Sequence, residues 1–213
     1  YFVQHWDTTM ARAGQVSIFN YDINQGNLWG TLLRHVWRVV AAFLWRGDFI
    51  PRHNVPLRPL FDPAVGLAFL VGLWVAWRRA RTQAAYAFLL AWLALMLLPT
   101  ILAEDAFHML RGAGVLPVLF VFPALGFLEG YRALSRRGHS RLAGMLLGAL
   151  LVFSAAVNVR AYVGHLHSEA VYYQFESGAT QMAAEINAYR GLGWSGYEGL
   201  VQEVPPPGGG QVY

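Results

Sequence analysis

The sequence predicts an all-α polytopic membrane protein with about four transmembrane helices and one amphipathic helix on the outer membrane surface. Three observations support this prediction: long apolar stretches, a low content of charged residues, and arginine-rich loops at alternate ends of the stretches. Of the 213 residues, 56% are hydrophobic and 13% are charged, whereas soluble domains carry about 25% charged residues. The net charge of +4 is small and dispersed, so nothing indicates nucleic-acid binding.

Four apolar stretches have the length of membrane-spanning helices. Each contains about 17 to 21 residues, which as a helix crosses a hydrocarbon core of ~30 Å. Asp62 is the only charged residue within them, and the Asp62-Pro63 pair predicts the N-terminus of the first helix. The four stretches are residues 60–77, 83–103, 112–128 and 142–159.

The loops between these stretches predict their orientation, because cytoplasmic loops of membrane proteins are enriched in Arg and Lys. Three arginines lie in each of the segments 78–81 and 136–141, which are therefore predicted to be cytoplasmic. The segment 104–111 holds two acidic residues and one arginine and is predicted to face outward. By alternation, residues 1–59 and 164–213 are outer-face segments that flank a membrane domain of residues 60–163. The segment 164–213 could begin a small soluble domain.

Residues 28–45 predict an interfacial amphipathic helix rather than a fifth span. Two arginines at mid-membrane would cost ~5–7 kcal/mol, whereas at the interface they stay solvated. The alternative is a helix packed on the other spans or on a soluble lid. At helical spacing, one face is expected to carry Leu28, Leu32, Val36, Val39, Val40 and Phe43, and the opposite face Thr31, Arg34, Arg38 and Ala42.

The ends of the sequence indicate part of a larger membrane protein. It begins with Tyr1-Phe2 rather than methionine, and no signal peptide precedes the first apolar stretch. Residues 204–211 are rich in proline and glycine and have the composition of a linker. Before this linker, residues 171–190 repeat apolar side chains at helical spacing and predict one surface helix. We expect a C-terminal or interior segment of the protein.

Seven residues in the outer-face segments are candidates for binding phosphate or lipid. Arginine binds phosphate oxygens with two parallel hydrogen bonds, and prolines around residues 51–63 present their neighbours on a stiff backbone. A helix over residues 105–111 would place its candidates at i, i+3 and i+6. Structural roles remain the alternative: lipid contacts, a local hydrogen bond, or loop packing. The candidates are His53, Arg58, Asp105, His108, Arg111, Arg34 and Arg38.

The sequence contains no nucleophile elbow, phosphate-binding glycine loop, HExxH motif or paired carboxylates. The absence of cysteine excludes disulfides, iron–sulfur clusters and thiolate zinc sites within this chain. His165 and His167 resemble a metal-binding pair, but structural roles are favoured, and no metal ligand is assigned. A transporter or flippase-like subunit and an inert scaffold remain alternatives to an enzyme. The spans lack the internal charges that ion coupling needs.

Four segments of the sequence resemble segments of a known protein family. In chain order they are "MARAGQVSIFN", "RHNVPLRPLFDP", "LLPTILAEDAFHMLRGAGVLP" and "VYYQFESG". Together, over most of residues 1–190, they resemble the C-terminal half of the family 39 membrane glycosyltransferases. These are bacterial relatives of protein O-mannosyltransferases and of the aminoarabinose transferase of lipid A.

The resemblance implies a fragment of the GT-C fold in the cell (inner or plasma) membrane. It implies that a sugar passes from a polyprenyl-phosphate donor to an unidentified acceptor on the outer face. The catalytic carboxylate of such enzymes lies in their N-terminal half, outside this segment. The residues present here would bind the donor phosphate, and His108, Arg111 and Arg58 are the best-placed candidates. The cofactor is undetermined, and the resemblance allows a divalent metal ion.

Overall fold

The computed structural model describes residues 4, 6–175 and 177–190. Throughout these residues the regular elements are helices, and one isolated antiparallel bridge joins Ser17 to Ala103. The predicted all-α class is therefore confirmed for the described part of the chain. The chain divides into two units, Tyr1–His165 and Leu166–Tyr213. The linker predicted at residues 204–211 lies outside the described residues.

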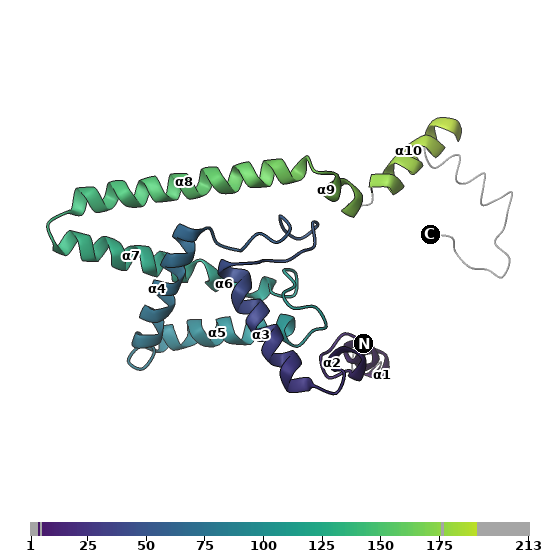
Figure 1. Ribbon diagram of the computed structural model, residues 1–213, viewed down its shortest axis with the longest axis horizontal. Coiled ribbons are helices and arrows are strands. Elements are labelled where there is room, and N and C mark those ends of the chain that lie inside the picture. The colour runs from purple at the N-terminus through teal and green to yellow at the C-terminus, as the bar shows by residue number, and fades with distance from the viewer. Residues whose placement is uncertain (1–3, 5, 176, 191–213) are drawn as a thin grey trace. The chain divides into compact units, whose positions relative to one another are not determined.

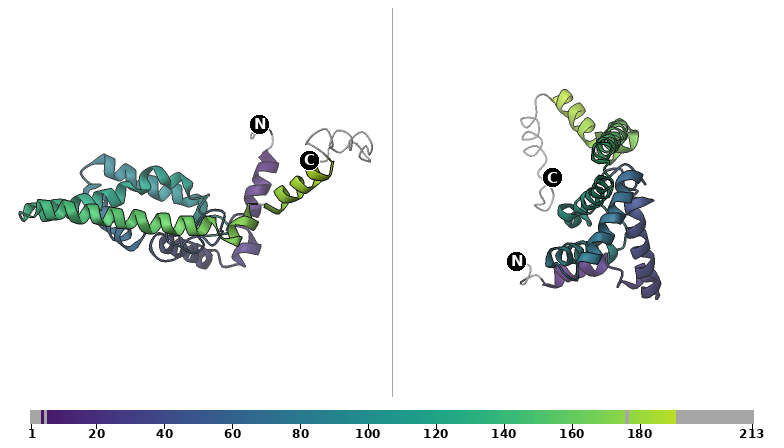
Figure 2. Two further views of the ribbon diagram at one scale, coloured as in Figure 1. Left: turned by 90° about the horizontal axis from the view of Figure 1, so that it is seen from above. Right: turned by 90° about the vertical axis from the view of Figure 1, so that its left-hand side faces the viewer.

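The first unit is a bundle of helices of unequal length (Figure 1). Two short helices precede the amphipathic helix, and a long loop then leads to four longer helical segments. Figure 2 shows the last of them, α8, along one side of the unit. The helices are α1 (Trp6–Gln15), α2 (Tyr21–Asn24), α3 (Leu28–Leu44), α4 (Pro63–Arg79), α5 (Ala84–Ile101), η1 (Ala113–Val115), α6 (Leu116–Leu119), α7 (Val121–Arg136) and α8 (Ser140–Leu166).

Three segments of the described chain are long and apolar enough to cross a membrane: Ala84–Ile101, Ala113–Arg136 and Ser140–Leu166. They correspond to the second, third and fourth predicted spans. The middle segment continues beyond residue 128, where the sequence predicted its end. It is divided at Phe120, between α6 and α7. Pro117 and Pro123 flank this division, as expected of residues that lack a backbone N–H.

The first predicted span forms α4, whose 17 residues make it about 26 Å long. The predicted N-cap is confirmed, because the Asp62 carboxylate accepts hydrogen bonds from the N–H groups of Ala64 and Val65 at 3.0 and 3.2 Å. Unlike the mostly exposed α5 and α8, α4 buries one side against protein. Within the described residues, α4 is therefore the helix that separates a count of three spans from a count of four.

The tightest contact in the core is the crossing of α4 and α7. A Cβ atom on Gly72 would overlap the carbonyl oxygen of Phe122, and one on Gly126 would overlap that of Ala68. A Cβ on Gly144 or Gly148, however, would have no neighbour within 4 Å.

Helix α3 confirms the amphipathic helix but corrects its faces. The buried residues are Thr31, His35, Val39, Ala42 and Phe43, and this face contacts α4 and α5. Thr31 and Ala42 were assigned to the opposite face, and Val36 and Val40, expected on the apolar face, are exposed. Small side chains let α3 approach its neighbours, and His35 Nδ1 lies 3.0 Å from the Ile101 carbonyl oxygen. Close packing and this hydrogen bond therefore decide which face of α3 is buried, more than the hydrophobicity of its side chains does.

Charged side chains link α4 and α7 within the first unit. Glu129 on α7 accepts hydrogen bonds from Arg79 at 2.8 Å and from Arg132 at 3.1 Å, and the bond from Arg79 joins α4 to α7. In Figure 1 the α4–α5 and α7–α8 turns lie toward the left of the unit, and the long α3–α4 loop reaches its right side.

The second unit contains α9 (Glu169–Gln174) and α10 (Ser177–Arg190). The prediction of one helix over residues 171–190 is therefore wrong. Ser177 and Gly178, which are poor residues for a helix interior, stand at the start of α10. The Ser177 hydroxyl donates a hydrogen bond to the carbonyl oxygen of Tyr172 at 2.5 Å, and this contact stabilises the turn between the helices.

Candidate functional site

Two loops of the first unit meet to form the candidate site. The first, residues 46–58, follows α3, and the second, residues 102–112, follows α5. The first loop is closed on itself by backbone hydrogen bonds from Gly47 to Leu57 at 3.2 Å and from Leu57 to Asp48 at 2.7 Å. It therefore has a defined conformation that can position side chains.

Asp48 joins the two loops. Its side chain is fully buried. The Oδ1 atom accepts a hydrogen bond from the Ile50 N–H at 2.9 Å, within its own loop. The Oδ2 atom accepts one from the Met109 N–H of the second loop at 2.9 Å and lies 3.2 Å from His53 Nδ1. One carboxylate thus fixes the register of both loops.

His53 and His108 lie beside this carboxylate, one on each loop. Their ring centroids are 4.6 Å apart, and the planes are inclined at 50°. The main chain of His108 is anchored to the end of α5, because its N–H donates to the hydroxyl of the buried Thr100 at 2.9 Å. We call Asp48, His53 and His108 the loop cluster.

Three nitrogen atoms at this site are buried without a hydrogen-bond partner: His53 Nε2, His108 Nδ1 and Arg111 Nη1. Within the described residues, one other buried side-chain atom, the Ser135 hydroxyl, shares this condition. Each unpaired polar group costs about 1–3 kcal/mol. Their concentration in one place indicates a site built to bind a polar ligand.

The electrostatics of the site keep His108 neutral. Burial lowers the pKa of His108 below its ordinary value, and the positive charge of Arg111 lowers it further, against the smaller opposing effects of Asp48 and Asp105. A neutral imidazole has one nitrogen with a free lone pair. Arg111 is itself balanced by Glu104, whose Oε1 lies 3.5 Å from its Nη2.

A cavity of about 580 Å³ opens next to the loop cluster. It shares both loops with the cluster, because Gly47 and Phe107 line the cavity and are followed in the chain by Asp48 and His108. Two arginines, one aspartate and four aromatic residues face it, and we call it the arginine cavity. It is lined by Trp37, Arg38, Ala41, Trp45, Arg46, Gly47, Phe49, Leu57, Asp105, Ala106 and Phe107.

The structure brings five of the seven predicted site residues to this region. His53 and His108 belong to the loop cluster, and Arg111 influences His108. Arg38 and Asp105 line the arginine cavity. Residues 105–111 do not form the helix considered for them: this segment consists of bends and turns that are held by Asp48 and Thr100.

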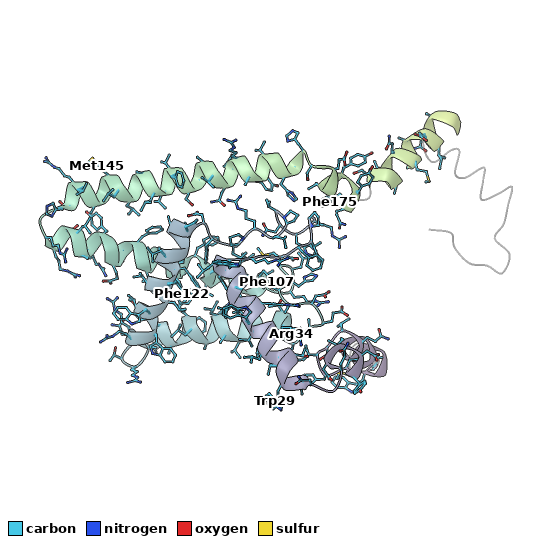
Figure 3. All side chains as sticks on the ribbon, viewed as in Figure 1. Trp29, Arg34, Phe107, Phe122, Met145 and Phe175 are labelled. Carbon is cyan, nitrogen blue, oxygen red and sulfur yellow. The ribbon has the colours of Figure 1, made fainter. Side chains whose placement is uncertain are left out.

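The other two predicted residues lie elsewhere. Arg58 donates a hydrogen bond to the Asn158 side chain on α8 at 3.0 Å. Asn158 and Ser154 in turn donate to the Asp62 carboxylate, so this network fastens α8 to the start of α4. Arg34 is exposed on α3 and does not line the arginine cavity, whereas Phe107 does. Figure 3 labels Arg34 and Phe107.

Asp48 and Arg46 are the site residues that sequence reasoning missed. Both occur in the short segment Arg46-Gly47-Asp48 directly after the amphipathic helix. An acidic residue five positions before His53 was the available signal. In sequence it resembles an ordinary turn aspartate, and its contact with Met109 lies 61 residues away.

No protein family model, no curated protein and no solved structure matches this chain. The residues of the two loops, at the ends of α3 and α5, are therefore the features from which a function can be inferred.

Proposed function

We propose that this chain is part of a membrane glycosyltransferase that moves a sugar from a polyprenyl-phosphate donor to an acceptor on the outer face of the cell (inner or plasma) membrane. The arginine cavity is the observation that carries this proposal. It combines two guanidinium groups, a carboxylate and aromatic walls at the loops that follow the helices α3 and α5. A sugar phosphate presents complementary groups, namely an anion, hydroxyls and an apolar ring face.

The charges of the cavity suit the donor. Arg38 and Arg46 can each direct two N–H groups at phosphate oxygens, and Asp105 can accept hydrogen bonds from sugar hydroxyls. Trp37, Trp45 and Phe49 supply the apolar lining that is usual in small-molecule sites. The polyprenyl chain would remain in the bilayer beside the apolar helices.

The proposal includes an arrangement in the membrane. The helix α4 acts as a fourth span, α3 lies at the outer interface, and both loops of the site face outward, as do residues 1–59 and 164–213. The described helices form part of a GT-C fold in this proposal. The carboxylate that activates the acceptor is supplied from outside these 213 residues.

The residues of the site would act mainly on the leaving group. Negative charge grows on the lipid phosphate as its bond to the sugar breaks. Arginine side chains near that phosphate then stabilise the transition state more than the ground state, which raises the rate. Arg38 on α3, Arg46 in the first loop and Arg111 in the second loop can take this role.

Binding of the donor tests the proposal. The full native protein, in lipid nanodiscs, is titrated with a polyprenyl-phosphate sugar, and the variant Arg46→Gln is compared with Arg34→Gln as a matched surface control. We expect saturable binding, weakened about 10-fold or more by Arg46→Gln because a charged hydrogen bond contributes about 1.5–3 kcal/mol. Absence of saturable binding, or equal effects of the two substitutions, would contradict the proposal.

Formation of a glycosylated product separates the transferase from a flippase. Both proteins would bind a lipid-linked sugar phosphate, but a flippase returns it unchanged on the other side of the bilayer. Release of the free polyprenyl phosphate is therefore the chemical signature that the proposal requires.

A further inference from the structure

The loop cluster has the composition and spacing of a metal site. Asp48, His53 and His108 each offer one ligand atom, and these atoms lie within 4.8 Å of one another. Ligand atoms about 2.0–2.2 Å from one tetrahedral zinc ion lie roughly 3.3–3.6 Å apart. Asp48 Oδ2 and His53 Nδ1, at 3.2 Å, are already close to this spacing. Because all three ligand atoms lie within 4.8 Å of one another, closure around an ion would shorten any of their separations by no more than about 1.5 Å.

We propose that Asp48, His53 and His108 bind one divalent transition-metal ion, of which zinc is the best match. This inference does not depend on the proposed glycosyltransferase. Two imidazole nitrogens and one carboxylate oxygen suit zinc and its neighbours, whereas magnesium and calcium prefer oxygen ligands. Three protein ligands are also the number found in catalytic zinc sites, which keep one position for water or a substrate oxygen.

The surroundings of the cluster support ligation in two ways. His108 Nδ1 is buried and lacks a hydrogen-bond partner, so its interaction with an ion would replace a missing contact. The Asp48 carboxylate is oriented by the N–H groups of Ile50 and Met109, both at 2.9 Å. Hydrogen bonds of this kind hold the first ligands of a metal in place.

The charge balance permits a cation. Arg111 is the positive group beside His108, and Glu104 lies 3.5 Å from it. Asp48 contributes a second negative charge inside the cluster, and Asp105 a third close to His108. With both histidines neutral, as metal ligation requires, Asp48 is the charged ligand of the cluster, and its charge is opposite in sign to that of the ion.

Metal titration of the full native protein in detergent tests the assignment. After treatment with a chelator, the protein is titrated with Co²⁺ and Zn²⁺, and binding is followed by calorimetry and by the visible absorption of Co²⁺. We expect one metal ion to bind per protein chain, and we expect this binding to require the loop cluster. The variants Asp48→Asn and His108→Gln should each lower the affinity by about 100-fold or more, at or beyond the upper end of what outer contacts contribute. The variant His139→Gln, at an exposed turn, should bind as the unmodified protein does.

A second variant keeps the test decisive if loss of a ligand unfolds the loops. In His108→Cys the thiolate can still bind Co²⁺, and a sulfur-to-cobalt charge-transfer band should appear. These 213 residues contain no cysteine, so a band that appears in His108→Cys and is absent from the unmodified protein reports directly that residue 108 is a ligand. The inference is overturned if His108→Cys binds Co²⁺ without this band, if the unmodified protein binds no stoichiometric ion, or if folded His108→Gln binds with unchanged affinity.

Discussion

At the scale of residues, the site depends on one buried carboxylate and the groups around it. Asp48 receives main-chain hydrogen bonds from both loops and lies next to His53. Its contacts therefore supply stability and position the histidines at the same time. The unpaired nitrogens of His53, His108 and Arg111 reduce that stability. Such a local loss of stability is common at binding sites, where the surrounding structure compensates for it.

Replacing Asp48 with alanine should destabilise the loops measurably. Two main-chain N–H groups and His53 lose their acceptor, so we expect a loss of about 3 kcal/mol or more in the free energy of unfolding. Thermal unfolding in detergent with a chelator present measures this effect without a metal contribution. Asp105→Ala, at an exposed position, is the control and should change stability by no more than about 0.5 kcal/mol. Equal stability of the two variants would show that Asp48 does not hold the loops together.

Replacing Arg111 with alanine should lower sugar transfer by ~10²-fold or more, the size typical of losing one electrostatic contact to the transition state. The initial rate of product formation by the full native protein measures this change. Arg34→Ala, on the exposed side of α3, should retain activity. An Arg111→Ala protein with unchanged turnover and unchanged donor affinity would remove Arg111 from the site.

The sequence indicated His53, His108 and Arg111 because they lie in predicted outer-face segments and because such side chains can bind phosphate oxygens. It did not lead to Asp48, because only the folded chain brings Met109 against that carboxylate. Nor did the sequence distinguish Arg58 from the residues of the site, because its partner Asn158 lies 100 residues away. Residue types were therefore predictable, and partners distant in sequence were not.

At the scale of elements, helix positions follow from hydrophobicity, but helix faces follow from packing. The amphipathic pattern correctly predicted α3, and the Asp62-Pro63 pair correctly predicted the start of α4. The buried face of α3 was misassigned because Thr31 and Ala42 are small rather than strongly apolar. Likewise, a glycine in a predicted span does not reveal which helix it meets.

Substitution of Gly72 with alanine should disturb the crossing of α4 and α7. The added methyl group would overlap the main chain of Phe122, which cannot move aside like a side chain. We expect a destabilisation of about 1–3 kcal/mol or more, typical of overpacking. Gly144→Ala is the matched control, since its Cβ would have no neighbour within 4 Å. Thermal unfolding of both variants makes the comparison, and similar midpoints would contradict the described crossing.

At the scale of the whole molecule, composition and segment length alone identified a helical membrane protein. Three described segments are long and apolar enough to cross a bilayer, and α5 and α8 leave most of their side chains exposed. Exposed apolar helices are stable in lipid or against further helices, and unstable in water. The length of α4 does not establish it as a fourth span, because α4 is short and partly buried. Helix length also does not show which end of a helix faces outward.

Labelling of introduced cysteines should establish the orientation. The sequence contains no cysteine, so Asp105→Cys and His139→Cys each provide one new thiol in an exposed position of this segment. These positions lie beyond opposite ends of the segment Ala113–Arg136. A membrane-impermeant maleimide added to intact cells should label residue 105 and leave residue 139 unlabelled until the membrane is opened. Labelling of both positions from the same side would exclude the proposed arrangement.

The most direct measurement of the central claim is an experimental structure of the full native protein with a bound polyprenyl-phosphate sugar. If the proposed function is right, the phosphate lies in the arginine cavity, within hydrogen-bond distance of Arg38 or Arg46, with the sugar against the aromatic wall of the cavity. A donor phosphate bound elsewhere, with the arginine cavity unoccupied in the same structure, would contradict the account.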